Sequence, residues 1–152
     1  MIMANTLTVN MGNKPCYDIY ITKGFDALTE QLSKISLENK KFAIITDSQV
    51  GPIYAEKVAD ALKDVATEVV TYSFKAGEAS KNLDTINEIY DFLLENNFTR
   101  SDVLIALGGG VVGDMTGFVA ATYMRGIDFI QVPTTLLAQV DSSVGGKTGV
   151  DY

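Results

Sequence analysis

Two hydrophobic periodicities alternate along this 152-residue chain. Short alternating or continuous apolar stretches, typical of strands, occur at 17–22, 41–46, 67–74, 102–107 and 128–132. Apolar residues spaced three and four apart predict helices from Phe25 to Ile35, from Val50 to Val65 and from Leu83 to Leu94, with Ser80 or Asn82 available to cap the third. This order predicts βαβ units, in which right-handed crossovers join parallel strands.

The last third of the chain differs from the rest in composition. A glycine-rich turn and a helix of small residues are predicted near 111–121, and Pro133 suits the first turn of a last helix. Nine of the 13 glycines but only six of the 31 charged residues lie in 103–152. This asymmetry indicates either a buried sheet centre with tight turns or a surface that faces a ligand or a second domain.

We therefore predict an α/β fold, a parallel sheet flanked by helices, as one domain over residues 1–152. The chain stops after 149–152 with no terminal helix or polar tail, so we expect it to be part of a longer protein.

Composition excludes several classes of protein. The 47% apolar and 20% charged residues exclude a disordered chain. A net charge of −7 without a basic run argues against nucleic acid as a partner, although a local positive pocket for a phosphorylated metabolite is compatible with it. No apolar run reaches the ~20 residues that a membrane helix needs, and 1–10 lack the pattern of a signal peptide.

The numbers of cysteines and histidines exclude several kinds of catalytic and metal site. The single Cys16 forbids an internal disulfide, which fits the cytoplasm. The chain has no histidine, so it cannot by itself supply Ser-His-Asp or Cys-His catalysis or a His-based zinc site.

The clearest motif is residues 108–113, which read GGGVVG and satisfy G-x-G-x-x-G. The motif follows a predicted strand and opens a predicted helix, a context in which backbone N–H groups bind a pyrophosphate at the helix N-terminus. A tight strand–helix turn is the alternative. The motif departs from the dinucleotide fingerprint by lying in a late βα turn rather than the first.

Acidic residues near these turns have two readings each. Asp114 suits either the helix dipole or a hydrogen bond to a ribose or nicotinamide. Asp47, at the end of a strand, suits equally a ribose hydroxyl or the start of the next helix. The spacing of Glu78 and Lys81 by itself favours a solvated capping segment.

Residues 145–148, GGKT, look like the end of a phosphate-binding P-loop, but Asp141 stands where that motif needs glycine, which argues against an NTPase. Asp141, Lys147 and Asp151 lie in an apolar, glycine-rich region. Charge there indicates site chemistry, with a buried ion pair as the alternative.

Residues 108–151, GGGVVGDMTGFVAATYMRGIDFIQVPTTLLAQVDSSVGGKTGVD, closely resemble the 3-dehydroquinate synthase family. The GEASK segment at 77–81 and the TDSQV segment at 46–50 also fit the order of motifs in that family. The resemblance implies a Rossmann-like NAD-binding N-terminal domain. The family's all-helical C-terminal domain, which carries a Glu and two His as metal ligands, is not in this chain.

The resemblance also implies roles for individual residues. It implies NAD contacts for Asp47, Gln49, Glu78, Lys81, Gly109, Gly110, Val111, Asp114, Thr134 and Thr135. It implies substrate contacts for Asp141 and Lys147, and a contact from Arg125 to the substrate phosphate across a homodimer interface. No metal ligand is expected within this chain.

The activity implied is conversion of 3-deoxy-D-arabino-heptulosonate 7-phosphate to 3-dehydroquinate and phosphate. NAD would oxidise a ring carbinol to a ketone, which acidifies the neighbouring C–H so that phosphate is eliminated. Reduction, ring opening and an aldol closure would follow. A divalent metal, zinc or cobalt, would polarise the reacting hydroxyl. The chain alone is expected to be inactive.

Two alternatives stay open on the sequence. Another sugar-phosphate cyclase of the same superfamily would share the NAD domain and take a different sugar phosphate. A stand-alone nucleotide-binding module would bind a nucleotide without catalysis.

Overall fold

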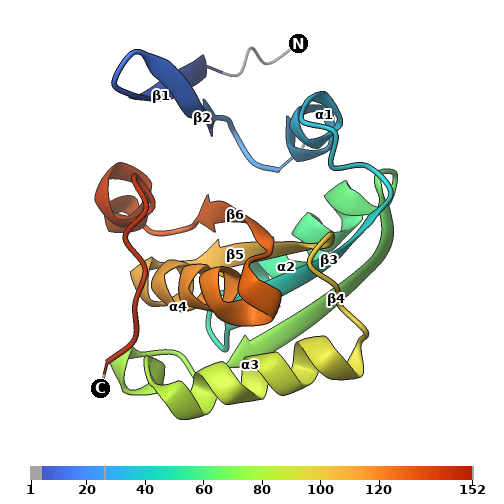
Figure 1. Cartoon of the computed structure of the whole chain (residues 1–152), viewed down its shortest axis with the longest axis vertical. Helices are drawn as coiled ribbons and strands as arrows, with labels where there is room; N and C mark the ends of the chain where they lie inside the picture. Colours follow the sequence, from blue (N-terminus) through green and yellow to red (C-terminus); the bar gives the residue numbers. More distant parts are fainter. Residues whose placement is uncertain (1–4, 26, 152) are drawn as a thin grey trace.

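Four parallel strands form the central sheet in the order β4-β3-β5-β6, as the computed structural model of residues 5–25 and 27–151 shows (Figure 1). The strands are β3 (Lys40–Asp47), β4 (Ala66–Phe74), β5 (Val103–Gly108) and β6 (Asp128–Pro133). The helices are α1 (Ala27–Lys34), α2 (Gly51–Leu62), α3 (Leu83–Glu95) and α4 (Gly110–Thr122). Shorter helical turns cover Glu78–Ser80, Tyr123–Arg125 and Ala138–Ser142, the last of them π-helical.

Helices cover both faces of this sheet. On one face, α3 and α4 pack against Ala43, Ile45, Leu104 and Ala106. On the other, α1 and α2 pack against strand residues that include Phe42, Ile44 and Ile105. Every residue of β5 is buried, because this strand has neighbours on both sides and helices on both faces. The predicted α/β fold is confirmed.

Local signals account for α3 and its ends. Asn82 accepts a hydrogen bond from the backbone N–H of Thr85 at 2.9 Å, so it is the N-cap that the sequence offered as one of two. Ile86, Ile89 and Leu93 form the buried stripe of the helix.

The N-terminal segment departs from the expected parallel arrangement. β1 (Asn5–Met11) was not predicted, and β2 (Lys14–Ile21), expected at 17–22, pairs antiparallel with it in a separate two-stranded sheet. Figure 1 shows this hairpin at the top of the molecule, apart from the four-stranded sheet. A tight turn around Gly12, whose φ is +64°, makes the antiparallel hairpin possible without a crossover helix.

The prediction that Pro133 begins the last helix is wrong. Pro133 is the last residue of β6, paired with Gly108 of β5. β6 is an edge strand, where a residue without an N–H is tolerated. No helix among residues 5–25 and 27–151 is long and apolar enough to cross a membrane.

Candidate nucleotide-binding site

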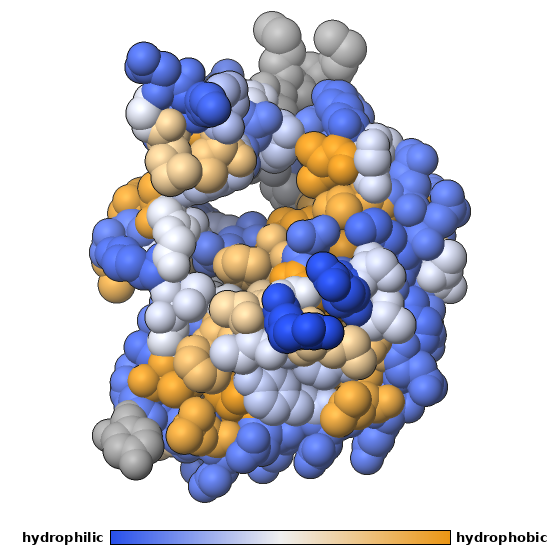
Figure 2. Space-filling model, viewed as in Figure 1, coloured by the Kyte–Doolittle hydropathy of each residue, from blue (hydrophilic) through white to orange (hydrophobic). Residues whose placement is uncertain are grey.

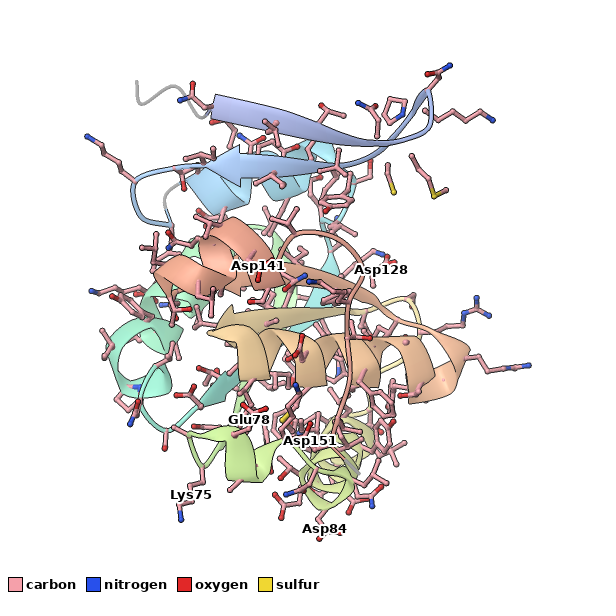
Figure 3. All side chains as sticks on the ribbon, turned by 90° about the vertical axis from the view of Figure 1, so that its left-hand side faces the viewer. Lys75, Glu78, Asp84, Asp128, Asp141 and Asp151 are labelled. Atoms are coloured by element: carbon pink, nitrogen blue, oxygen red, sulfur yellow. The ribbon has the colours of Figure 1, made fainter. Side chains whose placement is uncertain are left out.

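The carboxyl ends of the four parallel strands bring most of the predicted site residues to one edge of the sheet. From β3 the chain crosses to β4 on one side, and it later enters β5 on the other side of β3. Loops that leave β3 and β5 therefore diverge at this edge, which is the kind of switch point at which ligands bind in open α/β sheets. Figure 3 looks toward this edge, with Glu78, Asp141 and Asp151 labelled on it.

The glycine turn after β5 leaves the N-terminus of α4 bare. Gly109 is the N-cap residue and makes no side-chain cap, so the first N–H groups of α4 have no side-chain partner there. A Cβ at Gly109 would lie 3.2 Å from Thr135 Cγ2, and one at Gly110 would lie 3.2 Å from Ser142 Oγ. The absence of side chains keeps this helix end open to an anion, as the motif predicted.

Two buried hydroxyls beside this turn have no hydrogen-bond partner within the described residues: Thr134 Oγ1 and Ser142 Oγ. Thr134 directly follows β6, and its backbone N–H donates to the carbonyl of Gly108 at 2.9 Å. An unsatisfied buried hydroxyl costs about 1–3 kcal/mol, so these groups fit a site that receives a polar ligand. The sequence analysis missed Ser142, because no local motif indicates that it faces Gly110.

Asp47 is held in the turn after β3. Its Oδ1 accepts hydrogen bonds from the backbone N–H groups of Gln49, at 2.8 Å, and Val50, at 2.9 Å. The structure therefore shows the local turn-forming role for this oxygen. The NAD contacts expected of Asp47 and the exposed Gln49 stay predictions; both residues lie at the correct edge of the sheet.

Lys81 joins three carboxylates at the same edge. Its Nζ lies 3.0 Å from Asp114 Oδ2, 3.6 Å from Glu78 Oε1 and 4.0 Å from Asp151 Oδ1. The Lys81 side chain is only 17% exposed, so it is not the solvated capping residue that spacing alone favoured. Lys81 also compensates Asp114, which would otherwise repel a phosphate at the start of α4.

The hydrogen bond to Asp114 is the largest effect on the pKa of Lys81, and it raises that pKa. Partial burial lowers the pKa, whereas the negative charges of Asp114, Glu78 and Asp151 raise it further. The folded-state pKa therefore lies above the ordinary value of 10.5. The ion pairs stabilise the fold fully below that ordinary value, and this stability is lost as pH rises through the folded pKa.

We accordingly expect the stability difference between wild type and Lys81→Met to be constant from about pH 7 to 9 and to shrink above about pH 10.5. Urea unfolding at each pH measures it. Lys34→Met, which removes an exposed i,i+4 pair, is the control and should change stability by less than about 0.5 kcal/mol. A Lys81→Met difference that grows above pH 10.5 would contradict the assignment.

Asp141 and Lys147 lie on the segment that follows β6. Lys147 Nζ is 3.9 Å from Asp141 Oδ1, and the two side chains are 74% and 64% exposed. The pair is therefore not a buried ion pair, and both groups are available to a ligand. Residues 145–148 follow the Ala138–Ser142 turn and do not join a strand to a helix, the context that a P-loop needs.

Arg125 does not join the other candidates within one chain. It follows α4 and precedes β6, so it lies at the amino-terminal edge of the sheet, the length of a six-residue strand (about 20 Å) from the glycine turn. Met124, Arg125 and Gly126 have φ values of +48°, +68° and +120°. This left-handed turn presents an exposed arginine at the surface.

No group of three or more His, Cys, Asp or Glu side chains in the described part of the chain is placed to hold a metal ion. That the metal ligands of the full-length protein lie outside this chain stays a prediction.

Comparison with known proteins identifies relatives of the whole arrangement. Residues 71–152 match the family model of the 3-dehydroquinate synthase N-terminal region. The chain is 58% identical over 145 residues to 3-dehydroquinate synthase of Streptococcus mutans, an alignment that covers 95% of this chain and 41% of that protein. The chain thus spans about two fifths of the length of the curated relatives it matches.

Solved structures share the fold. A 2-deoxy-scyllo-inosose synthase complexed with carbaglucose-6-phosphate, NAD+ and Co2+ superposes with a TM-score of 0.82 at 26% identity, over 99% of this chain and 40% of that one. A 2-epi-5-epi-valiolone synthase from Streptomyces hygroscopicus with NAD+ and Zn2+ bound gives 0.75 at 26% identity, over 96% of this chain and 40% of that one. The Rossmann-like expectation is confirmed at the level of fold.

Proposed function

This chain belongs to the 3-dehydroquinate synthase family, and on that premise we propose that it is the NAD-binding part of an enzyme that converts 3-deoxy-D-arabino-heptulosonate 7-phosphate to 3-dehydroquinate and phosphate. The observation that carries the proposal is the open N-terminus of α4, beside which lie the hydroxyls of Thr134 and Ser142, both buried and without a hydrogen-bond partner among the described residues. The solved relatives that contain NAD+ support the choice of cofactor.

The residues present fit NAD. A pyrophosphate would lie against Gly109, Gly110 and Val111, where the backbone N–H groups and the helix dipole favour an anion. Thr134 and Thr135 would close that site from the end of β6. Glu78, Lys81 and Asp114 would contact the part of the cofactor nearer the nicotinamide, and Asp47 and Gln49 the adenosine. Bound NAD would supply reversible oxidation of the substrate.

The substrate would lie between the cofactor and the segment 141–147. Lys147 would supply a cation where negative charge develops during phosphate elimination, and Asp141, 3.9 Å from that ammonium group, would contact the substrate beside it. A divalent metal, zinc or cobalt, fits the proposal only with ligands from outside this chain. It would act as a Lewis acid on the reacting hydroxyl.

A second subunit completes the proposed site. Arg125 lies at the amino-terminal edge of the sheet, about the length of β6 from the glycine turn of its own chain. A homodimer in which Arg125 reaches the partner subunit's site resolves this. We place the enzyme in the cytoplasm, without nucleic-acid or membrane partners.

The 152-residue chain alone is expected to release no phosphate from the heptulosonate phosphate, because it lacks histidine and the proposed metal ligands. A phosphate-release assay checks this, with the full-length protein as the positive control. Measurable turnover by the chain alone would contradict the proposal.

The same assay separates the alternatives. A full-length protein that prefers a hexose 6-phosphate to the heptulosonate phosphate would be another sugar-phosphate cyclase. One that binds NAD and turns over neither would be a nucleotide-binding module.

A further inference from the structure

The N-terminal hairpin and the Lys147 segment are joined by one hydrogen bond. The backbone N–H of Gly145 donates to Tyr17 Oη at 2.7 Å, across 128 residues of sequence. Tyr17 lies on β2, opposite Val9 of β1, and these two directly opposed residues are half-buried while most of the hairpin is exposed. They share one face of the hairpin.

In the segment that Tyr17 contacts, Thr148 packs closely against Gly117 of α4, whereas the glycines on either side of Lys147 and Thr148 do not pack. A Cβ at Gly145, Gly146 or Gly149 would meet nothing within 4 Å. Of the backbone N–H groups of residues 145–148, only that of Gly145 has a hydrogen-bond partner in the described part of the chain, and the partner is Tyr17. Before this stretch, Val144 is tied to the carbonyl of Asp141, and after it Gly149 is tied to that of Asp114.

The anchor lies two residues before Lys147, whose side chain is 74% exposed. Gly145 has φ +96°, a backbone conformation that glycine adopts readily, and the chain bends here just before Lys147. Each backbone residue that must be ordered costs free energy when the ligand binds. Because the hydrogen bond to Tyr17 already orders the backbone at Gly145, less of that free energy has to be spent when the substrate binds.

A two-stranded hairpin is marginally stable by itself in water, and it must be held by contacts with the rest of the protein. Figure 1 shows this hairpin above the C-terminal segment, and the space-filling view in Figure 2 is open between the hairpin and the body beneath it. In these views the hairpin lies above the segment that follows β6, and the hydrogen bond from Gly145 to Tyr17 joins the two.

We infer that Tyr17 is a positioning residue, which orders the Lys147 segment for the sugar phosphate through its hydrogen bond to Gly145. The inference rests on the proposed function, because Lys147 is the group that it positions. It assigns to the hairpin a role in substrate capture that is separate from NAD binding.

The test is Tyr17→Phe in the full-length protein, which keeps the ring and removes only the hydroxyl. Tyr20→Phe is the matched control, because Tyr20 lies on the same strand and, among the described residues, its hydroxyl hydrogen-bonds only to Asp18 of that strand, at 3.4 Å. Two quantities are measured in both variants: hydrogen exchange at the Gly145 amide, and steady-state kinetics with the heptulosonate phosphate, with NAD affinity measured separately.

We expect Tyr17→Phe to accelerate exchange at Gly145 about tenfold and to raise KM for the sugar phosphate about three- to tenfold, the range that the loss of one hydrogen bond gives. The kcat, the NAD dissociation constant and the exchange of the Asp151 amide, which donates to the Lys81 carbonyl, should stay within about twofold. Tyr20→Phe should change none of these.

Three results would overturn the inference: unchanged exchange at Gly145, accelerated exchange with unchanged KM, or equal effects of the two variants. The exchange measurement needs no turnover. If the wild-type protein does not act on the sugar phosphate, the proposed function fails, while faster exchange at Gly145 would still establish the anchor.

Discussion

Valine in place of Gly110 is expected to weaken NAD binding by the full-length protein about a hundredfold or more, equivalent to roughly 2.7 kcal/mol. A Cβ there already lies 3.2 Å from Ser142 Oγ, so the branched side chain fills the space between α4 and the Ala138–Ser142 turn. That space is where the pyrophosphate would approach the backbone N–H groups. Calorimetric titration with NAD measures the loss.

A folding defect is separable from this effect. Valine has a higher helix propensity than glycine, which offsets part of the cost of displacing Ser142 Oγ, so the free energy of unfolding should fall by no more than about 1–3 kcal/mol, which urea unfolding measures separately. Gly146→Val is the matched control, because a Cβ there meets nothing within 4 Å. NAD affinity retained in Gly110→Val would show that the cofactor does not use this turn.

Alanine in place of Arg125 is expected to lower kcat/KM for the heptulosonate phosphate about a hundredfold or more, while NAD affinity stays near wild type. A guanidinium can make two charge-assisted hydrogen bonds to a phosphate, and their loss accounts for that magnitude. Arg125→Lys should recover only part of the loss, because an ammonium group cannot reproduce the bidentate geometry.

The fold gives no reason for Arg125→Ala to unfold the protein. Alanine adopts the left-handed backbone of this turn at a cost similar to that of arginine, roughly 1–2 kcal/mol for each. Arg100→Ala is the matched control, because Arg100 is exposed at the same amino-terminal edge, just before β5. It should leave kcat/KM unchanged.

A mixed dimer tests the second-subunit role directly. One subunit carries Arg125→Ala and the other Lys147→Ala, so one composite site keeps both native residues. Such a dimer should retain up to about half of wild-type activity, whereas the double variant in both subunits should be inactive. Equal inactivity of the two would contradict the cross-subunit contact.

The candidate site was predictable from the sequence where it depends on a single turn. The run at 108–113 follows a buried strand and opens a helix, and both neighbours were recognisable from their own periodicity. Thr134 and Thr135 were reached only by resemblance, because nothing local indicates that the end of β6 lies beside the end of β5.

The pairing of distant charges was not predictable in this way. Spacing alone made Lys81 a solvated residue, yet packing of the loop after β4 against α4 puts it beside Asp114. For Asp47 the sequence favoured equally a ribose contact and a role at the start of the next helix. In the structure its Oδ1 accepts hydrogen bonds from two backbone N–H groups of the turn after β3. Side-chain contacts of this kind depend on which strands become neighbours in the sheet.

The sequence by itself determined the succession of helices and strands along the chain from β3 to β6, the burial of the central strands and the bare N-terminus of α4. Backbone geometry imposes a period of two on strands and 3.6 on helices, so each segment records its own type. The tertiary structure alone decided that β1 and β2 leave the sheet, that Ser142 faces Gly110, that Tyr17 holds Gly145, and that Arg125 lies at the opposite edge. These contacts join residues far apart in the chain, and they follow from strand order and from the packing of the whole domain, which no local pattern records.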